Sequence, residues 1–346
     1  MSDQFSNVQG EFEAQKARIM IIGVGGGGNN TVSTLMSKGV EGAKIIAINT
    51  DAKHLQITKA NEKILIGKNI TKGLGAGGYP DIGKQAALES KNEIKKALEG
   101  VDLLFVTCGL GGGTGTGAAP VVSKIAKDAG AIVIAAVTMP FKLEGARMLK
   151  AEEGLAHLRE ACDTVIVIEN QKLLQLGGKM PIKQAFGIAD GLIALMIKGI
   201  TEMIAVPSMV NLDFADVKAI MRSGGVATIG VGEAEGPKRA VDAITRALSH
   251  PLLDVDYTGA TGALIQVIGG PDMKLDEIEL IGEAVQQNMS QDAQVMWGAR
   301  ILPEFEHKIQ VITIITGIKS AYIIGPTGAK MAKPKGPTGE LGIDSI

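Results

Sequence analysis

Short apolar runs alternate with amphipathic stretches along the first half of the chain. The runs have the length and continuous hydrophobicity of strands buried on both faces, and they read RIMIIG, KIIAIN, DLLFVTC, AIVIAAVT and TVIVIE. Stretches of helical period lie between them, at about residues 30–38, 84–98, 118–128 and 149–160. This alternation predicts an α/β fold with a Rossmann-like parallel sheet covered on both faces. Ligands are then expected at the carboxyl ends of the strands.

A long apolar pattern follows, from about residue 182 to residue 206, and Pro207 ends it. The charges of Lys183, Asp190, Lys198 and Glu202 interrupt it too often for a membrane span, so we interpret it as a buried helix that links two domains. A second, smaller α/β unit comes after it. Its expected strands are ATIGVGEA, ALIQVIGG, QVMWGARI and KIQVITIITGI, with helices at about 238–249 and 275–288.

These patterns divide the chain into five parts. The ends are polar or rich in glycine, proline and lysine, which favours flexible segments. We predict a flexible N-terminal arm at 1–17, a larger α/β domain with the expected ligand site at 18–181, a central helix at 182–207, a C-terminal α/β domain at 208–319 and a flexible tail at 320–346.

Composition excludes several classes of protein. With 346 residues, of which 45% are hydrophobic, the chain is long enough for two domains with sizeable cores. A net charge of -2 and 3% aromatic residues argue against nucleic acid as the main partner. The chain has no apolar run long enough to insert in a bilayer and no recognisable signal peptide, so we expect a cytoplasmic protein.

Cysteine and histidine give no sign of a metal site. Cys108 and Cys162 border apolar runs, which is typical of reduced thiols in a core. The four histidines are scattered, and we predict no protein-bound metal cluster.

The first glycine cluster, GVGGGGNN, follows the first strand and opens a helix. Gly23, Gly25 and Gly28 satisfy the pattern GxGxxG, and Asp51 stands at the end of the second strand. An oxidoreductase that binds a dinucleotide would have the same features, because glycine lets the backbone approach a pyrophosphate. A tight turn retained for packing is the structural alternative.

The second cluster, GLGGGTGTG at residues 109–117, favours a different ligand. It follows the strand that ends at Cys108 and precedes a helix, so it offers backbone N–H groups at the positive end of a helix dipole. Thr114 and Thr116 can add hydroxyl donors to phosphate oxygens. Two phosphate-binding segments at neighbouring helix N-termini indicate a nucleoside triphosphate.

The sequence lacks the motifs of the familiar nucleoside triphosphatases. It contains neither GK[ST] nor NKxD. Instead, GGGTGTG together with NTDAKHL, TKGLGAGGYPDIG, PFKLEG, KAEEG and NLDFADV, in this order, resembles the FtsZ family, the prokaryotic relatives of tubulin. The resemblance runs from about residue 18 to residue 319. The first glycine block, GGGGNN, and the short spacing before KAEEG are closer to the archaeal than to the bacterial pattern.

The resemblance implies a GTP site made of several segments. It places phosphate-binding residues at Gly26, Gly27, Gly28, Asn29, Asn30, Gly111, Gly112, Gly113, Thr114, Gly115, Thr116 and Gly117, and further nucleotide contacts at Asp51, Gly75, Ala76 and Gly77. Glu144 and Arg147 match the acid and the arginine of the sugar and phosphate loop. Asn30, Asn170 and Asp190 match the groups that read the guanine edge, and Phe186 matches the ring that packs on the base. Amides and carboxylates suit that role because guanine presents the N1 and N2 hydrogens, which adenine lacks.

NLDFADV at residues 211–217 carries the catalytic expectation. From spacing alone, Asp213 and Asp216 at the start of a helix favour a capping arrangement. GTP hydrolysis, however, needs a polar group that orients water, and the phosphate loops supply no acid. The resemblance implies that Asp213 and Asp216, supported by Asn211, enter the nucleotide site of the next subunit as a synergy loop and position water and cation there.

The implied function is a cytoplasmic GTPase of the mid-cell division ring that forms head-to-tail filaments and is activated by its own polymerisation. GTP and GDP are the expected nucleotides, with Mg²⁺ bound through the nucleotide and K⁺ as a further candidate. The expected partners are other copies of the chain and a membrane tether or division protein at the tail, where a tail without partners is the alternative. Two other functions stay open at this point: the dinucleotide oxidoreductase and a GTP-binding scaffold that does not hydrolyse.

Overall fold

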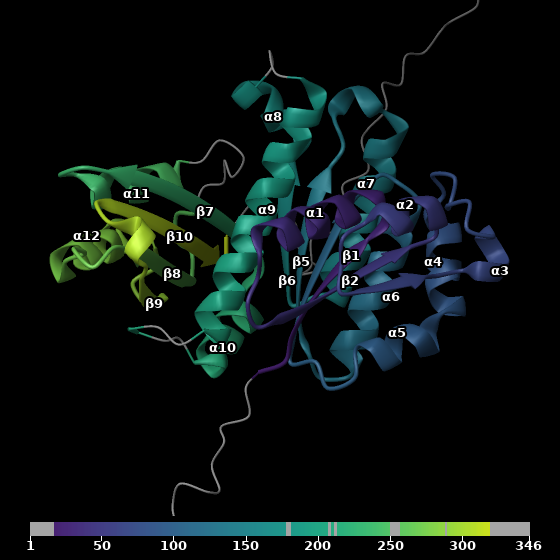
Figure 1. The fold of residues 1–346 in the computed structure, drawn as a ribbon, viewed down its shortest axis with the longest axis horizontal. Coiled ribbons are helices and arrows are strands. Elements are labelled where there is room, and N and C mark those ends of the chain that lie inside the picture. Colours follow the sequence, from purple (N-terminus) through teal and green to yellow (C-terminus); the bar gives the residue numbers. More distant parts are fainter. Residues whose placement is uncertain are drawn as a thin grey trace, which may run out of the picture.

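A ten-stranded sheet runs through two structural units. The structure is a computed structural model, which describes residues 17–177, 181–206, 209–210, 213–249, 257–287 and 289–318. Within these residues the strand order is β3-β2-β1-β4-β5-β6-β7-β10-β8-β9. Figure 1 shows the larger unit and the smaller unit on opposite sides of the long helix α9 (Ile182–Ala205), which lies close to the bounds predicted from the sequence.

The larger unit contains the predicted parallel sheet. Its strands are β1 (Ile19–Val24), β2 (Ala43–Asn49), β3 (Glu62–Leu65), β4 (Leu103–Gly109), β5 (Ile132–Met139) and β6 (Thr164–Glu169). Each neighbouring pair among them is parallel, which confirms the Rossmann-like arrangement. The short edge strand β3 was not predicted, because its four residues EKIL show no clear apolar run.

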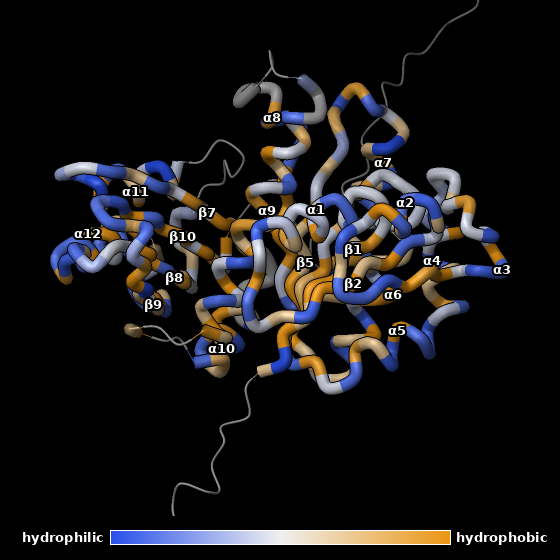
Figure 2. The backbone as a smooth tube through the Cα atoms, in the orientation of Figure 1, coloured by the Kyte–Doolittle hydropathy of each residue, from blue (hydrophilic) through white to orange (hydrophobic). Residues whose placement is uncertain are grey.

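Helices cover both faces of this sheet. One face packs against α1 (Gly25–Lys38), α9 and α10 (Phe214–Gly224), and the other against α4 (Pro80–Glu89), α5 (Lys91–Ala97), α6 (Thr114–Asp128) and α7 (Ala146–Ala161). Figure 2 shows β1, β2 and β5 as an apolar centre between more polar helices. The short helices α2 (Ala52–Ile57), α3 (Lys68–Thr71) and α8 (Asn170–Gly177) follow strand ends.

The single helix expected at residues 84–98 is two helices, α4 and α5, which meet at Ser90. The Ser90 backbone leaves the helical region, with φ -94° and ψ 17°, and its hydroxyl accepts a hydrogen bond from the Gly67 N–H. A serine that bonds to a neighbouring loop can interrupt a helix without breaking its apolar period, so the pattern alone did not show the break.

The smaller unit extends the sheet in a mixed arrangement. It contains β7 (Gly225–Glu235), β8 (Gly262–Gly269), β9 (Gln294–Ile301) and β10 (Lys308–Thr316), with α11 (Arg239–Leu248) and α12 (Leu275–Gln286) around a separate core. β10 is antiparallel to β7 and β8, whereas β8 and β9 are parallel. β7 joins the larger sheet through two residue pairs with β6, Thr164 with Gly225 and Val165 with Val226.

Both cysteines are free thiols in the core, as predicted. Burial raises the pKa of the Cys162 thiol to about 12 and raises that of Cys108 further. None of the helices in the described part of the chain is long and apolar enough to cross a membrane.

Candidate functional site

Two helix N-termini meet at the carboxyl ends of neighbouring strands. α1 begins at Gly25, directly after β1, and α6 begins at Thr114, after the turn that follows β4. β1 and β4 are paired in register, Val24 opposite Cys108, so the two helices start side by side. A Cβ placed on Gly25 would lie 2.8 Å from the Gly115 backbone nitrogen. Two sets of free N–H groups and two positive dipole ends therefore share one place, which suits a polyanion.

The glycine-rich segments belong to these helices more than the sequence suggested. The helices were expected to begin at about residues 30 and 118, but each starts about one turn earlier. Glycine is a poor helix former, and its presence in a first turn has a different cause here: the backbone packs too closely for side chains. A Cβ on Gly28 would lie 2.1 Å from the Thr107 carbonyl oxygen, and one on Gly117 would lie 1.8 Å from that of Pro80.

Other glycines of the same segments face open space. A Cβ on Gly26 or Gly112 would have no atom within 4 Å. Gly111 has a φ of +88°, which an L side chain rarely adopts, and it turns the chain between β4 and α6. Close packing therefore explains Gly28 and Gly117, whereas Gly26 and Gly112 leave their backbone accessible. We call the backbone of residues 25–28 and 111–114 the anion cradle.

A loop from the α3–α4 connection forms another wall of the cradle. The Thr50 and Thr114 hydroxyls share a hydrogen bond of 2.6 Å, and Gly75 N–H donates to the Thr50 carbonyl oxygen. Ala76 lies against Gly113, whose Cβ would be 2.8 Å from that of Ala76. Asp51 Oδ1 accepts the His54 N–H and caps α2. The predicted residues Asp51, Gly75 and Ala76 thus lie beside the second glycine segment, together with Gly77, which has φ +59°. Thr50 was not predicted, because a single threonine at a strand end carries no pattern.

Glu144 and Arg147 lie at the start of α7, on the other side of Gly111. Arg147 Nη1 donates to Glu144 Oε2, and Phe141 N–H donates to Glu144 Oε1 at 2.9 Å. The arginine and this backbone hydrogen bond outweigh burial and hold the pKa of Glu144 below its usual value. A Cβ on Gly111 would lie 2.8 Å from the Arg147 carbonyl oxygen, so the pair borders the anion cradle.

Two buried amides, one on α1 and one at the start of α8, have side-chain atoms without a hydrogen-bond partner among the described residues. Asn29 is fully buried, and neither of its side-chain polar atoms has a hydrogen-bond partner among the described residues. Asn170, at the start of α8, is 7% exposed and its Oδ1 is likewise unpaired there. Asn29 is therefore enclosed in the core, whereas Asn170 lies close to the surface at the start of α8. Asn30, to which the resemblance gave the base-reading role, is exposed.

Asp190 and Phe186 come from the first turns of α9. The Thr31 hydroxyl donates to Asp190 Oδ1 at 2.7 Å and so ties α9 to α1. Burial raises the pKa of the Asp190 carboxyl, and the Thr31 hydrogen bond offsets this in part. Phe186 is 40% exposed and packs edge to face against Phe141, with ring centroids 5.7 Å apart. A half-exposed ring is suited to pack on a planar heterocycle. Sequence reasoning did not identify Thr31 or Phe141.

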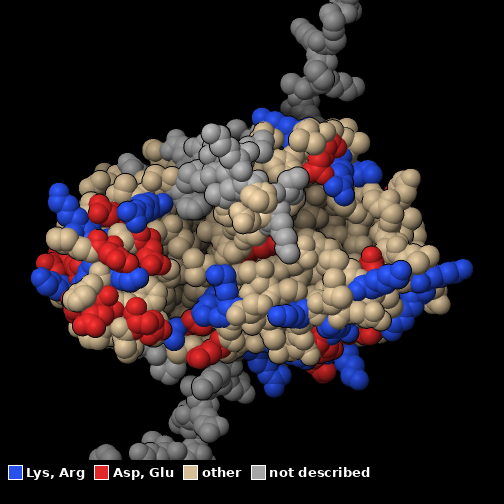
Figure 3. Space-filling model, turned by 45° about the horizontal axis from the view of Figure 1, so that its top comes forward, with Lys and Arg blue, Asp and Glu red and all other residues tan. Residues whose placement is uncertain are grey.

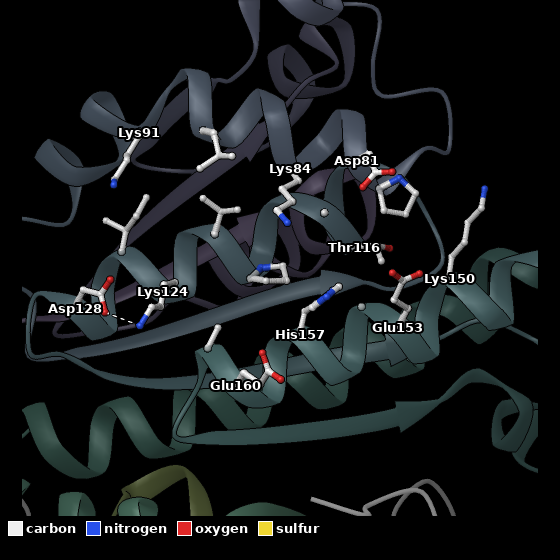
Figure 4. Close-up of a pocket in the computed structure, with 18 of the residues that line it drawn as sticks. Asp81, Lys84, Lys91, Thr116, Lys124, Asp128, Lys150, Glu153, His157 and Glu160 are labelled. Carbon is white, nitrogen blue, oxygen red and sulfur yellow. Dashed lines mark ion pairs between the residues drawn. The ribbon is translucent and has the colours of Figure 1, made fainter. Parts of the chain in front are cut away.

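Thr116 points away from the cradle. Its methyl group lies against Gly154 of α7, where a Cβ would be 2.3 Å away, and the residue lines a cleft of about 870 Å³. Figure 4 shows this cleft between α4, α6 and α7, with Lys84 and His157 on facing sides and Thr116 near Glu153. Successive residues of a helix are about 100° apart, so Thr114 and Thr116 leave α6 on different sides. The structure brings the Thr114 hydroxyl, but not that of Thr116, to the cradle.

The predicted catalytic residues lie far from these groups. Asp213 precedes α10, and its Oδ1 accepts the Ala215 N–H at 3.4 Å, which is the capping contact considered above. Asp216 follows in the first turn of α10, and Asn211 lies outside the described residues. Figure 1 shows α8 and α10 at opposite ends of the molecule, with α9 running between them. α9 has 24 residues and is therefore about 36 Å long.

In the view of Figure 3, charged side chains of both signs are dense over the smaller unit, and separate basic and acidic groups also lie across the middle. Among the described residues there is no group of three or more His, Cys, Asp or Glu side chains placed to hold a metal ion. The N–H groups at the two helix starts contribute fixed positive dipole ends to this site.

Comparisons with known proteins agree with this geometry. Residues 18–178 match the model of the Tubulin/FtsZ family, GTPase domain, and residues 225–319 match that of the FtsZ family, C-terminal domain. The chain is 56% identical to Cell division protein FtsZ 2 of Methanocaldococcus jannaschii over 326 residues, which are 93% of this chain and 85% of that protein. It is 52% identical to Cell division protein FtsZ 1 of Archaeoglobus fulgidus over 322 residues, 93% and 88% of the two chains.

Solved structures give the same result. A structure described as an empty FtsZ dimer of M. jannaschii matches with a TM-score of 0.84 and 50% identity, over 88% of this chain and 89% of that one. CetZ2 of Haloferax volcanii, described as a GTPγS-bound protofilament, matches with a TM-score of 0.74 and 26% identity, over 87% and 93%. The resemblance found in the sequence is confirmed.

The two classes of glycine predict different defects. In Gly117→Ala, the new Cβ meets the Pro80 carbonyl oxygen, so we expect a lower melting temperature. In Gly112→Ala, the Cβ enters open space, so we expect an unchanged melting temperature. Because that space belongs to the anion cradle, the methyl group should weaken nucleotide affinity by about tenfold or more, which is about 1.4 kcal/mol. Thermal unfolding and equilibrium binding of GTP measure the two effects. Equal melting temperatures for both variants, or full affinity in Gly112→Ala, would contradict this division of roles.

Proposed function

The chain belongs to the FtsZ branch of the tubulin/FtsZ family of GTPases, and from this premise we propose that it forms head-to-tail filaments in which one subunit binds GTP and the next subunit completes the hydrolytic site. The proposal includes a role in the division ring, as the names of its relatives suggest. The family match argues against the dinucleotide oxidoreductase, although GxGxxG is present.

One observation carries this proposal: α1, whose start forms the cradle, is bonded to Asp190 in the N-terminal half of α9, whereas Asp213 follows the C-terminal end of α9. From Asp190 to Ala205 the helix rises by about 22 Å, which keeps Asp213 away from the cradle of its own chain. When two complementary surfaces lie at opposite ends of one molecule, their contact is heterologous, and it propagates as a filament when it does not close into a ring. The protofilament that the CetZ2 structure is described as containing agrees with such a contact in a relative.

The residues at the cradle suggest how GTP binds. The N–H groups at the starts of α1 and α6 would hold the phosphates, with the Thr114 hydroxyl beside them. The exposed Asn30 amide, the Asn170 amide and the Asp190 carboxylate would read the guanine edge, and Phe186 would pack on the base. Glu144 and Arg147 would border the phosphates and sugar, together with residues 75–77.

Hydrolysis would need the second subunit. The cradle offers N–H groups and hydroxyls, which stabilise negative charge but do not orient an attacking water. In the filament, Asp213 and Asp216 of the next subunit would accept hydrogen bonds from that water, with Asn211 in support. Release of the γ-phosphate then removes charge from the contact between subunits, so assembly becomes reversible.

We propose that cations bind at this site mainly through the nucleotide. Since no cluster of metal ligands is formed by the described residues, Mg²⁺ would be held chiefly by the phosphates, with K⁺ as a further candidate at the subunit contact. Mg²⁺ would neutralise charge that develops on the phosphate oxygens. A membrane tether or division protein remains the proposed partner of residues 320–346, which lie outside the described residues.

The proposal predicts a GTPase rate that depends on assembly. Because each site needs two subunits, the rate should rise more steeply than in proportion to protein concentration, and light scattering should rise over the same range. Phosphate release and scattering would be recorded at fixed GTP across a concentration series, with ATP as the control nucleotide. A rate strictly proportional to concentration would contradict completion by a neighbour. Scattering without phosphate release would indicate a scaffold.

Asp213 is expected to matter for turnover but not for binding. Asp213→Ala should bind GTP and assemble like the unaltered chain, while its turnover per assembled subunit falls by about a hundredfold or more, the effect expected when a group that positions a reactant is removed. Sedimentation of filaments and phosphate release in the same samples measure both properties. Lys218→Ala, two residues beyond Asp216 on α10, is the control and should hydrolyse normally. Normal turnover in Asp213→Ala would refute the role.

Asp190 predicts a pH dependence of guanine binding. Its carboxylate must be ionised to accept the N1 and N2 hydrogens, and burial raises its pKa. Affinity for GTP should therefore fall as the pH decreases, and the fall should begin above the usual range for an aspartate. Asp190→Asn should bind weakly, with only the pH dependence that phosphate protonation causes. Titrations of both proteins from neutral to acidic pH measure the difference, and parallel curves would contradict the assignment.

A further inference from the structure

A buried ion pair joins the C-terminal end of α9 to the smaller unit. Arg300 Nη1 on β9 lies 2.7 Å from Glu202 Oε2, and these side chains are 16% and 9% exposed. Lys198 Nζ lies 3.7 Å from the other Glu202 oxygen and donates to the carbonyl oxygen of Lys38, the last residue of α1. Glu202 is therefore flanked by two cationic side chains, Lys198 on its own helix and Arg300 on β9 of the smaller unit.

β9 in turn holds the segment that leads to Asp213. Val210 N–H donates to the Ala299 carbonyl oxygen and Ala299 N–H donates to that of Val210, both at 3.3 Å. Ala299 directly precedes Arg300. Asp213 follows Val210 by three residues. Because a chain extends at most about 3.6 Å per residue, Asp213 lies within about 11 Å of this bridge.

β9 is held in the sheet by β8, and the Glu202–Arg300 ion pair connects it to α9. β9 is the last strand in the sheet order and pairs with β8 along one edge, while its other edge carries the Val210 bridge. On the far side of Asp213, α10 packs between the two units: Val217 and Ile220 are fully buried in a core that also contains Leu264 of β8. The Thr164 hydroxyl of β6 donates to the Met221 carbonyl oxygen of α10. The chain therefore runs from α10 back through Asp213 to Val210, which is bonded to β9. The ion pair of Glu202 with Arg300 connects β9 to α9.

We propose that Glu202 and Arg300 are positioning residues for GTP hydrolysis in the neighbouring subunit: their ion pair holds β9 against α9, and β9 presents the Asp213 segment at the angle that the next subunit's nucleotide requires. This inference rests on the proposed role of Asp213. Neither residue contacts the anion cradle of its own chain, so their effect acts through the loop. Loss of one partner would leave the other charge buried without its counter-ion, which is unfavourable. The remaining side chain would turn toward water, and we expect β9 to shift as a result.

The first test compares Glu202→Gln with a control in the same unit. Turnover per assembled subunit should fall between about tenfold and about a hundredfold, while the monomer's GTP affinity and the amount of sedimented filament stay unchanged. Arg300→Lys keeps the charge and should retain more turnover than Arg300→Gln. The control is Glu277→Gln, which disrupts the buried pair with Arg239, 2.7 Å apart, without touching β9's bridge. It should lower the melting temperature but leave turnover unchanged.

Mixed filaments separate positioning from general damage. If Glu202→Gln impairs only the Asp213 segment that a subunit donates to its neighbour, a site is active whenever the donating subunit is unaltered. An equimolar mixture should then show about half the unaltered rate. If the variant also damages its own nucleotide site, the mixture should show about a quarter. The rate at a series of mixing ratios, at constant total protein, distinguishes a linear from a quadratic dependence.

Including Asp213→Ala in the same assays keeps the two proposals distinct. If Asp213→Ala is inactive and Glu202→Gln and Arg300→Gln turn over GTP normally, the positioning role is refuted and the function stands. If Asp213→Ala turns over GTP normally, the proposed function itself fails. A quadratic mixing curve, or an equal loss of turnover in Glu277→Gln, would show that the effect of Glu202 is general destabilisation.

Discussion

The structure depends on the close approach of two helices to one edge of a parallel sheet. Because β1 and β4 are neighbours in register, α1 and α6 start side by side. The close packing needs glycine at three places, because a Cβ on Gly25 would meet the α6 backbone, one on Gly28 that of β4 and one on Gly117 that of α4, each within 3 Å. The same absence that permits the packing leaves N–H groups uncovered at two positive dipole ends. Fold and anion binding therefore have one cause.

The sequence allowed much of the architecture to be predicted because buried parallel strands are continuous apolar runs. It also located both glycine segments and the bounds of α9 to within a residue or so. It did not separate the glycines that pack from those that face open space, since that distinction depends on which backbone lies opposite. The break at Ser90 was missed for a similar reason: its hydroxyl partner, Gly67, is remote in sequence.

Side-chain direction was the other limit. The pattern TGTG offers two equivalent hydroxyls, but helical geometry sends Thr114 toward Thr50 and Thr116 toward α7. Of the adjacent pair Asn29 and Asn30, the structure buries the first and exposes the second. Thr31 and Phe141 become visible only through their contacts with Asp190 and Phe186. Each of these outcomes needs the tertiary position of a helix, which no local pattern contains.

The junction between β6 and β7 is narrow compared with the strands that it joins, because only two residue pairs cross it. A tilt of one unit against the other would strain this brief ladder and little else of the hydrogen-bonded backbone. Resistance to such a tilt comes instead from side chains, since α9 and α10 share one core with Ile229 of β7, Leu264 of β8 and Ile312 of β10. In the filament that we propose, curvature would therefore depend on how this shared core shifts, while the hydrogen-bonded sheet offers little resistance.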